Sequence, residues 1–416
     1  MKEWLGPEVL LGGRRLAKHA VIPPHVTVIV INRNYAEFIG ATIDSIHNQT
    51  YPWFECLIAD NASTDDSRAV ITARVRDDPR FKIFEFDRNI GHLGAAIKLL
   101  DHVSGEFVCF IDSDDFLFPD YLASHVQTHL ALPAPVGLTS SSYVEIDRHG
   151  RLLNAAPAHL SDVAEKGERG FRPVRMVPRL TVVSNREFDR LSKASSYLPW
   201  NARGWLWGPG TSNMYRRSLM ELARPALPND VWLGGVDAYF NSFVHVLTGT
   251  GIIDQQLSAY RIHGANDYSL RPMVTIIRSG SEESDARAIE VRQLLCRTLL
   301  ERCRQVDFVL NGDRFWTALD VIPCCFGREL AAFHARLADA FAANFPALCA
   351  VFGEKRVIME LRQRLTHADF RGLMAKAHGG RIPIATRRRM TSVEVSRQGR
   401  RLRGVLASVA RSPGRA

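Results

Sequence analysis

The chain has 416 residues, of which 46% are hydrophobic and 23% charged, a composition typical of a globular protein that excludes a disordered or fibrous chain. Residues 381–416 hold ten arginines and one acid, which accounts for the whole net charge of +9. Because the remaining residues are formally neutral, we expect no nucleic-acid partner. The arginine-rich tail is either a contact for anionic lipid headgroups or a solvated segment.

The sequence has no apolar window near the roughly 18 residues of a membrane-spanning helix, and its start lacks the apolar core of a secretory signal. Its seven cysteines are scattered, without Cys-x-x-Cys or zinc-ligand spacing. We therefore expect reduced cysteines and a cytoplasmic protein, peripheral at the inner face of the cell membrane if the tail binds lipid.

Strands and helices alternate from residue 26 onward. The β-branched run 26–31 predicts a strand buried on both faces, and Ile39, Ile43 and Ile46 predict an amphipathic helix after it. The same pattern continues with strands at 54–59, 81–86 and 107–111 and helices at 66–77 and 95–103. This alternation predicts an α/β fold with a mostly parallel sheet flanked by helices, and ligand-binding loops at one edge of the sheet.

Polar residues follow these strands at the predicted ligand edge. Asp60 and Asn89 come after the second and third strands, and Asp112-Ser113-Asp114-Asp115 comes directly after the fourth. If strand geometry persists, Asp112 and Asp114 point the same way, and carboxylates held close together resist joint ionisation. Mn²⁺ or Mg²⁺ shared with substrate phosphates would relieve that repulsion. An acidic turn that caps the next helix is the alternative.

The spacing of the glycines after the third strand excludes the two commonest nucleotide-binding motifs. Gly91-x-x-Gly94, after Asn89, matches neither the dinucleotide-binding G-x-G-x-x-G nor a P-loop. A sugar nucleotidyltransferase shares the sheet and the metal, but it usually has a Gly-rich basic loop after the first strand, where this chain has Asn32-Arg33-Asn34-Tyr35. A non-catalytic carbohydrate-binding relative of a transferase is the other alternative.

Four stretches, in this order and spacing, resemble the inverting family-2 glycosyltransferases of the GT-A fold. They are the first strand with Asn34-Tyr35, residues 58–65, residues 89–94 and residues 110–115. A looser resemblance runs through residues 211–217, 235–237 and 260–266 and ends near residue 270. The resemblance implies metal-dependent transfer of a sugar, from a nucleotide-sugar that we expect to be a UDP-sugar, to an acceptor hydroxyl in cell-surface glycan or polysaccharide biosynthesis.

The resemblance also assigns roles on the donor side. Asp60 would accept the ring N–H of the base, while Asn34 and Asn89 complete the nucleotide-sugar site. Asp112 would contact the ribose or the metal, and Asp114 would hold the Mn²⁺ or Mg²⁺. Turn capping is the structural alternative for Asp60.

Three further positions complete the implied site. His263 would approach the metal or the diphosphate, and Arg261 would stabilise the leaving diphosphate; a structural histidine and a solvent-facing arginine are the alternatives. Asp237 falls at the position of the general base, although relatives often carry Glu-Asp where this chain has Val236-Asp237. Its alternative is to cap a helix over residues 238–247.

The acceptor side is expected in a tryptophan-rich loop. Residues 200–210 contain three tryptophans, and Trp205 and Trp207 could stack on sugar C–H surfaces or simply pack in the core. A glycan, a lipid-linked glycan or a protein would each serve as acceptor. Apolar stripes after residue 281 predict helices. We expect an N-terminal arm (1–24), a GT-A domain (25–270) with an insertion (141–199), a helical domain (271–380) and the tail (381–416); the oligomeric state stays open.

Overall fold

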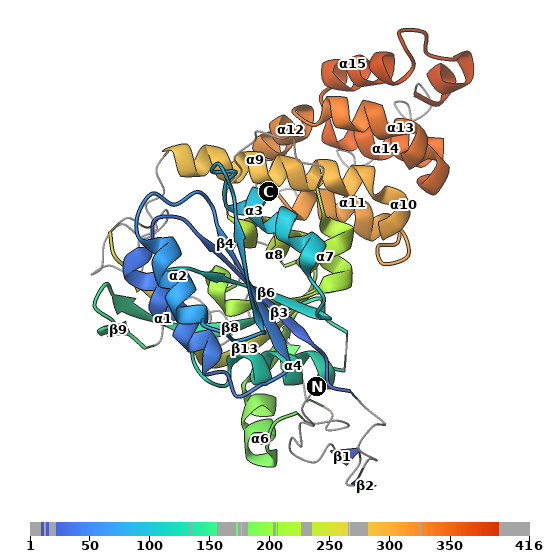
Figure 1. The fold of residues 1–416 in the computed structure, drawn as a ribbon. Coiled ribbons are helices and arrows are strands. Elements are labelled where there is room, and N and C mark those ends of the chain that lie inside the picture. Colours follow the sequence, from blue (N-terminus) through green and yellow to red (C-terminus); the bar gives the residue numbers. More distant parts are fainter. Residues whose placement is uncertain are drawn as a thin grey trace, which may run out of the picture. The chain divides into compact units, whose positions relative to one another are not determined.

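The computed structural model describes most of the chain. The described residues are 10–11, 14–15, 22–133, 135–155, 172–173, 176, 182–202, 205, 207–225, 235–264, 266, 282–323 and 327–390. The chain divides into two compact units, residues 1–295 and 296–416 (Figure 1). The predicted domain boundary at 270/271 lies outside the described residues, and so does the tail from residue 391 onward.

Four parallel strands form one half of the sheet in the first unit, in the order β6-β3-β4-β5. They are β3 (Val26–Asn32), β4 (Phe54–Asp60), β5 (Phe81–Glu85) and β6 (Phe107–Asp112). Every residue of β3 and β4 is buried, as their apolar runs predict for strands covered on both faces. The connecting helices are α1 (Ala36–His47), α2 (Ser67–Val75) and α3 (His92–Leu99), the last followed by a 3₁₀ turn at Leu100–His102.

The other half of the sheet is mainly antiparallel and continues from β6 in the order β12-β8-β13-β11-β10. Its strands are β8 (Leu138–Asp147), β10 (Arg172–Pro173), β11 (Ser195–Leu198), β12 (Asn213–Arg216) and β13 (Thr250–Ile262). Short strands β7 (Phe116–Leu117) and β9 (Leu152–Asn154) pair with β13 and β8. The predicted insertion at 141–199 is therefore too wide, because most of β8 and all of β11 belong to the sheet.

Strand β13 pairs in parallel with β8 and is irregular along that pairing. The register shifts between Ile253 and Gln256 and again between Gln256 and Ser258. After these shifts the pairing continues to Ile262, directly before His263.

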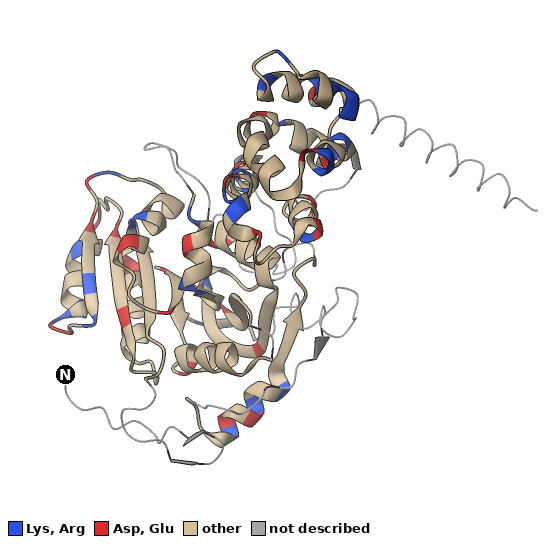
Figure 2. Cartoon of the chain, turned by 90° about the vertical axis from the view of Figure 1, so that its right-hand side faces the viewer, with Lys and Arg blue, Asp and Glu red and all other residues tan. Residues whose placement is uncertain are grey.

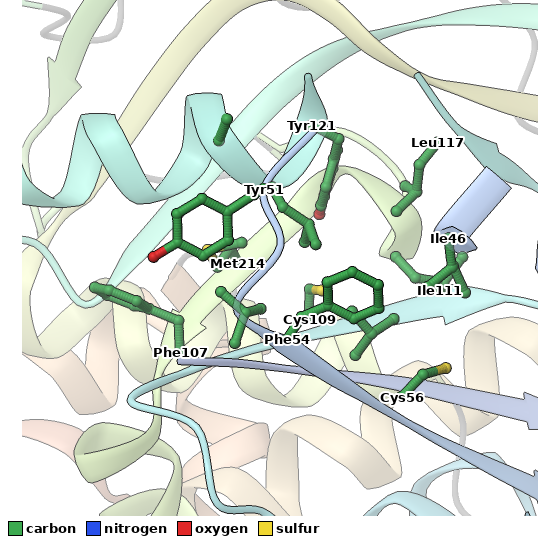
Figure 3. Close-up of a cluster of buried hydrophobic side chains, with 14 of the residues drawn as sticks. Ile46, Tyr51, Phe54, Cys56, Phe107, Cys109, Ile111, Leu117, Tyr121 and Met214 are labelled. Atoms are coloured by element: carbon green, nitrogen blue, oxygen red, sulfur yellow. The ribbon is translucent and has the colours of Figure 1, made fainter. Parts of the chain in front are cut away.

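Helices cover both faces of the sheet (Figure 1). Helices α1, α2 and α4 (Tyr121–Ala131) lie on one face, and α3, α7 (Arg217–Ala223) and α8 (Val236–Thr248) lie on the other. Figure 3 shows the core on the first face, where Phe54, Phe107 and Cys109 of the strands meet Tyr121 of α4 and Tyr51. Among the described cysteines all five are free and four are buried, consistent with the expectation of reduced core residues. The prediction of an α/β fold is confirmed.

The C-terminal region is helical, as predicted. Its helices are α9 (Glu282–Glu301), α10 (Cys303–Val306), α11 (Gly312–Val321), α12 (Gly327–Ala335), α13 (Ala338–Phe352), α14 (Glu354–Arg364) and α15 (His367–Ala377). The division between the units falls within α9. Basic and acidic residues are interspersed along the later helices (Figure 2), while the predicted stripes bury Leu295, Leu299, Phe333 and Phe341.

Within the described part of the chain, no single helix has both the length and the apolar character needed to span a membrane. By length and composition alone, one pair meets that need, Glu329–Ala335 with Ala338–Phe352, bent by 72° at the break between them.

Candidate donor and metal site

The carboxyl ends of the parallel strands bring the predicted polar residues to one edge of the sheet. In the β3–β4 pairing Asn32 lies opposite Asp60, and in the β4–β5 pairing Asp60 lies opposite Glu85. Ile31 of β3 lies opposite Asp112 of β6. Asp60 and the acidic turn therefore follow the two strands on either side of β3, at a common edge of the sheet, as the alternating pattern predicts.

The acidic turn does not continue the strand. Strand β6 ends at Asp112, whose carbonyl accepts the N–H of Asp115 at 3.1 Å, so the chain reverses here. The expectation that Asp112 and Asp114 share a strand face is wrong for this reason, and the two side chains have different neighbours. The Asp112 carboxylate, 31% exposed, lies 3.7 Å from His92 Nε2. It lies so close to Gly210 that a Cβ there would be 2.9 Å from Asp112 Oδ2.

Asp115 is the buried anchor of this turn. Its Oδ2 accepts the Thr211 hydroxyl at 2.7 Å, and its Oδ1 accepts the Arg261 backbone N–H at 2.8 Å. Thr211 Oγ1 also accepts the Asp112 N–H at 3.1 Å, so one hydroxyl joins both ends of the turn. Burial, together with the nearby carboxylates of Asp114 and Asp112, raises the pKa of Asp115 well above its usual range.

Asp114 is paired with His263 across the sheet edge. His263 Nε2 lies 2.8 Å from Asp114 Oδ2, and the two side chains are only 6% and 11% exposed. The imidazole is enclosed by the rings of Tyr35 and Phe38, with centroids 5.6 and 5.1 Å away, and its backbone N–H donates to Asn266. His263 therefore lies beside the acidic turn, while its predicted role at a metal or a diphosphate stays a prediction.

These residues fit a divalent cation as two of its ligands. Neighbouring ligands of an octahedral ion with bonds of about 2.1 Å lie about 3 Å apart, close to the 2.8 Å between Asp114 Oδ2 and His263 Nε2. Among the described residues, no group of three or more His, Cys, Asp or Glu side chains is arranged to hold a metal. A cation here would therefore take its other ligands from water or a substrate, as Mg²⁺ commonly does.

Arg261 binds the backbone of the acidic turn. Its guanidinium Nε donates to the Asp114 carbonyl at 2.7 Å, its Nη1 donates to the carbonyls of Asp147 and Arg148 at 3.3 and 3.0 Å, and it lies 4.9 Å from the Phe38 ring centroid. The residue is 5% exposed. The expected contact between Arg261 and a diphosphate does not fit this arrangement, because these donors are committed to backbone carbonyls.

Asp60 lies at the centre of a buried hydrogen-bond network. Its side chain is 1% exposed, its Oδ2 accepts the N–H of Ser63 at 3.2 Å and Arg68 Nε at 2.8 Å, and its Oδ1 accepts Asn32 Nδ2 at 3.3 Å. Burial raises the pKa of Asp60, but hydrogen bonds from Ser63, Arg68 and Asn32 outweigh burial and lower it overall. The carboxylate is therefore ionised and already bound on both oxygens.

The two predicted asparagines organise their own loops. Asn34 has a positive φ of 59°, and its Oδ1 accepts the Thr64 N–H at 2.7 Å. Asn89 Oδ1 accepts Asn61 Nδ2 at 3.0 Å and the Gly91 N–H at 2.9 Å. Beside the first of these loops, a pocket of about 610 Å³ is lined by Arg33, Asn34, Tyr35, Ala36, Glu37, Phe38, Asp65 and His263. Because His263 is one of the lining residues, the Asp114–His263 pair lies at the wall of this pocket.

Asp237 lies in the first turn of α8, where its Oδ1 accepts the N–H of Ala238 at 2.8 Å. Burial first, and then the charges of Asp237 and Asp112, raise the pKa of the buried Tyr215 hydroxyl well above its usual value. That hydroxyl donates to Asn241 Oδ1, one turn further along α8, at 2.6 Å.

The two tryptophans differ in what they can offer an acceptor. Trp207 is 4% exposed, its indole N–H donates to Thr250 Oγ1 at 3.0 Å, and its ring packs against His245. Trp207 therefore belongs to the core and does not fit the predicted stacking role. Trp205 is half-buried and meets the Trp207 ring edge-on at 5.4 Å.

Sequence reasoning missed Thr211, Arg68 and His92. Thr211 stands in the stretch 211–217 that carries the looser resemblance, but no spacing rule marks a threonine that bridges positions 112 and 115. Arg68 lies one helical turn after the Ser63-Thr64-Asp65 segment, where a basic residue on the predicted helix was a usable signal.

Residues 27–172 match the model of the family described as Glycosyl transferase family 2. The chain is 26% identical over 245 residues to an uncharacterized glycosyltransferase of Nostoc sp., which is 58% of this chain and 66% of that protein. It is 36% identical over 106 residues, 25% of this chain and 34% of the relative, to the GalNAc(5)-diNAcBac-PP-undecaprenol beta-1,3-glucosyltransferase of Campylobacter jejuni.

Among solved structures, S. aureus TarS 1–349 in complex with UDP-GlcNAc matches with a TM-score of 0.47 at 16% identity, over 90% of this chain and 92% of that one. The matches to the first curated relatives span 66%, 49% and 61% of their length.

Proposed function

This chain belongs to glycosyl transferase family 2, and on that premise we propose that it is a metal-dependent, inverting glycosyltransferase that uses a UDP-sugar. The observation that carries the proposal is the Asp114–His263 pair at 2.8 Å, beside Asp112, at the carboxyl edge of the parallel strands. Ligands of open α/β sheets bind at this edge.

On the donor side, Asp114 and His263 would hold Mn²⁺ or Mg²⁺, with Asp112 near the ribose or the same ion. A divalent cation bound there would offset the negative charge of the departing nucleoside diphosphate. Arg261, Asp115 and Thr211 keep the turn in place, so that the Asp114 carboxylate is held before the donor arrives. The pocket along residues 33–38 would receive part of the nucleotide-sugar.

On the acceptor side, Asp237 would act as the general base. Its carboxylate takes the proton of the acceptor hydroxyl while that oxygen attacks the anomeric carbon in line, opposite the leaving diphosphate. The hydrogen bond from Ala238 N–H uses one oxygen of Asp237 and orients the side chain. Trp205, half-buried beside the core residue Trp207, is the remaining candidate for stacking on the acceptor sugar.

The acceptor would be a lipid-linked glycan of the cell surface. Two relatives are named for undecaprenol-linked substrates, the Campylobacter jejuni enzyme and an Escherichia coli glucosyltransferase that is 31% identical over 105 residues. The arginines of residues 381–416 suit the anionic headgroups of the membrane in which such an acceptor lies.

Thermal unfolding with nucleoside diphosphates tests the donor site directly. We expect UDP with Mn²⁺ to raise the unfolding temperature of the full chain, because a ligand at 100 times its Kd stabilises the folded state by about 3 kcal/mol. Neither UDP nor Mn²⁺ alone should give the full shift, and Asp114→Asn should abolish the joint effect. Stabilisation by GDP and not by UDP would overturn the choice of nucleotide, and an unchanged response in Asp114→Asn would overturn the metal site.

A further inference from the structure

Segment 207–213 leads from the tryptophan-rich loop to the first residue of β12, and it is bound to β13 near both of its ends. At its start the Trp207 indole N–H donates to Thr250 Oγ1 at 3.0 Å. Near its end Ser212 Oγ lies 2.8 Å from Ser258 Oγ. Thr250 and Ser258 both belong to β13, so the sheet fixes this segment at two places.

The side chain of Asn213 holds the middle of this segment. The residue is fully buried, and its Nδ2 donates to the carbonyl oxygens of Pro209 at 2.7 Å, Gly210 at 3.3 Å and Gly208 at 3.4 Å. Its Oδ1 has no hydrogen-bond partner among the described residues. Because an unpaired buried oxygen costs folding free energy, packing alone does not account for an asparagine at this position. The three carbonyls that it binds do account for it.

Gly210 is the residue of this segment that contacts the donor site. A Cβ on Gly210 would have the Asp112 carboxylate as its three nearest atoms, with Oδ2 at 2.9 Å and both Cγ and Oδ1 at 3.6 Å. Gly210 is not among the residues with a positive φ, so its backbone would accept alanine. The close approach of the Asp112 carboxylate is therefore what favours glycine here.

We infer that Gly210 and Asn213 are positioning residues for Asp112. Asn213 fixes the carbonyls of the segment, and the segment places Gly210 against Asp112 Oδ2. His92 Nε2 lies 3.7 Å from Oδ1 of the same carboxylate. The inference rests on the proposed function, in which Asp112 contacts the ribose of the donor or its metal ion. A side chain that is held in place before the ligand arrives loses less entropy on binding, so this arrangement favours donor affinity.

Calorimetric titration of the full chain with Mn²⁺ and whichever of UDP and GDP the wild type binds, run as a double-mutant cycle, tests the inference. Gly210→Ala forces the Asp112 carboxylate to move and should raise the Kd at least about tenfold, the loss of one hydrogen bond to a charged group. Asn213→Leu, which removes the amide donors, should raise the Kd as well. In an Asp112→Ala background neither substitution should change the Kd further, because the carboxylate on which both act is absent.

Two comparisons separate positioning from a general defect in folding. Gly40→Ala is the matched control, because Gly40 lies inside α1 and a Cβ there would be at an ordinary contact distance of 3.4 Å from Arg74 Nε. This variant should bind like the wild type. A merely structural role would lower the urea midpoints of Gly210→Ala and Asn213→Leu without making their effect on the Kd depend on Asp112. Gly210→Ala removes no hydrogen-bonding group, and it decides the question if Asn213→Leu does not fold.

The outcomes separate the inference from the proposed function. If Gly210→Ala binds the nucleotide like the wild type, or weakens binding equally with and without the Asp112 carboxylate, the positioning role is overturned and the proposed function stands. If Asp112→Ala itself binds as tightly as the wild type, Asp112 has no part in the donor site and the inference falls, while the proposed Asp114–His263 metal site is unaffected. If the wild type binds neither UDP nor GDP in the presence of Mn²⁺, the proposed function fails and the inference fails with it.

Discussion

The hydroxyl of Thr211 makes two hydrogen bonds on which the acidic turn depends. Replacing Thr211 with valine keeps the shape of the side chain and removes both bonds, one from the Asp112 N–H and one to Asp115 Oδ2. Thr211 and Asp115 are fully buried, so Asp115 Oδ2 would lose this partner in the protein interior. The matched control is Thr211→Ser, which keeps the hydroxyl and deletes only a methyl group.

The size of the effect follows from the groups that valine leaves unpaired. Each buried donor or acceptor without a partner costs about 1–3 kcal/mol, so we expect Thr211→Val to lose about 2–4 kcal/mol of unfolding free energy. Thr211→Ser should lose about 1 kcal/mol, the transfer energy of one methyl group. Because the chain has two compact units, urea unfolding should be followed by tryptophan fluorescence and by circular dichroism together. Equal unfolding midpoints for the two variants would refute the bridging role of Thr211.

Three other changes have defined outcomes. Burial raises the pKa of Glu55, but hydrogen bonds from Ser104, Lys82 and Thr27 outweigh burial and lower it to about 2. The difference in unfolding free energy between the wild type and Glu55→Gln, measured from urea midpoints, should therefore be largest above about pH 5 and should vanish as the pH falls toward 2. Burial lowers the pKa of His245 to about 4, so this residue should account for about 2 kcal/mol of the stability that the wild type loses between pH 7 and pH 5, as the unfolded chain takes up its proton. An equally steep loss in His245→Gln would contradict this account. Asp237→Asn should reduce sugar transfer by about 10²–10⁴-fold with an unchanged Kd for UDP and Mn²⁺, and retained turnover would remove Asp237 as the base.

The first half of the fold was predictable because its signals are local. Strands β3, β4 and β6 are mostly apolar or β-branched, and each ends at the first polar residue of the loop. The apolar pattern, and the polar residues that end it, therefore located the ends of these strands within about a residue. The antiparallel half was harder, since β8 contains Ser140, Ser141 and Ser142, which are buried by neighbouring strands and not by their own hydrophobicity.

The site was predicted better in its location than in its contacts. Topology alone placed Asp60, Asp112 and Asp114 at one edge, because parallel strands end together there. The partners of these side chains depend on residues about 100 to 150 positions away, such as Thr211 with Asp112 and His263 with Asp114. The role of Arg261 was missed for a similar reason, since an arginine that binds backbone carbonyls leaves no pattern in the sequence of its partners.

The irregular pairing of β13 with β8 has a consequence for insertions and deletions. Between Ile253 and Ser258 this strand advances five residues while β8 advances two, so β13 holds three more residues than its neighbour over that interval. Paired residues share a face of the sheet, so removal of one residue from this interval exchanges the faces of the downstream residues of β13 if their pairing with β8 slips by one position. Arg261 would then turn away from the Asp114 carbonyl and His263 from the Asp114 carboxylate, so a deletion far from the acidic turn in the sequence would break the Asp114–His263 pair.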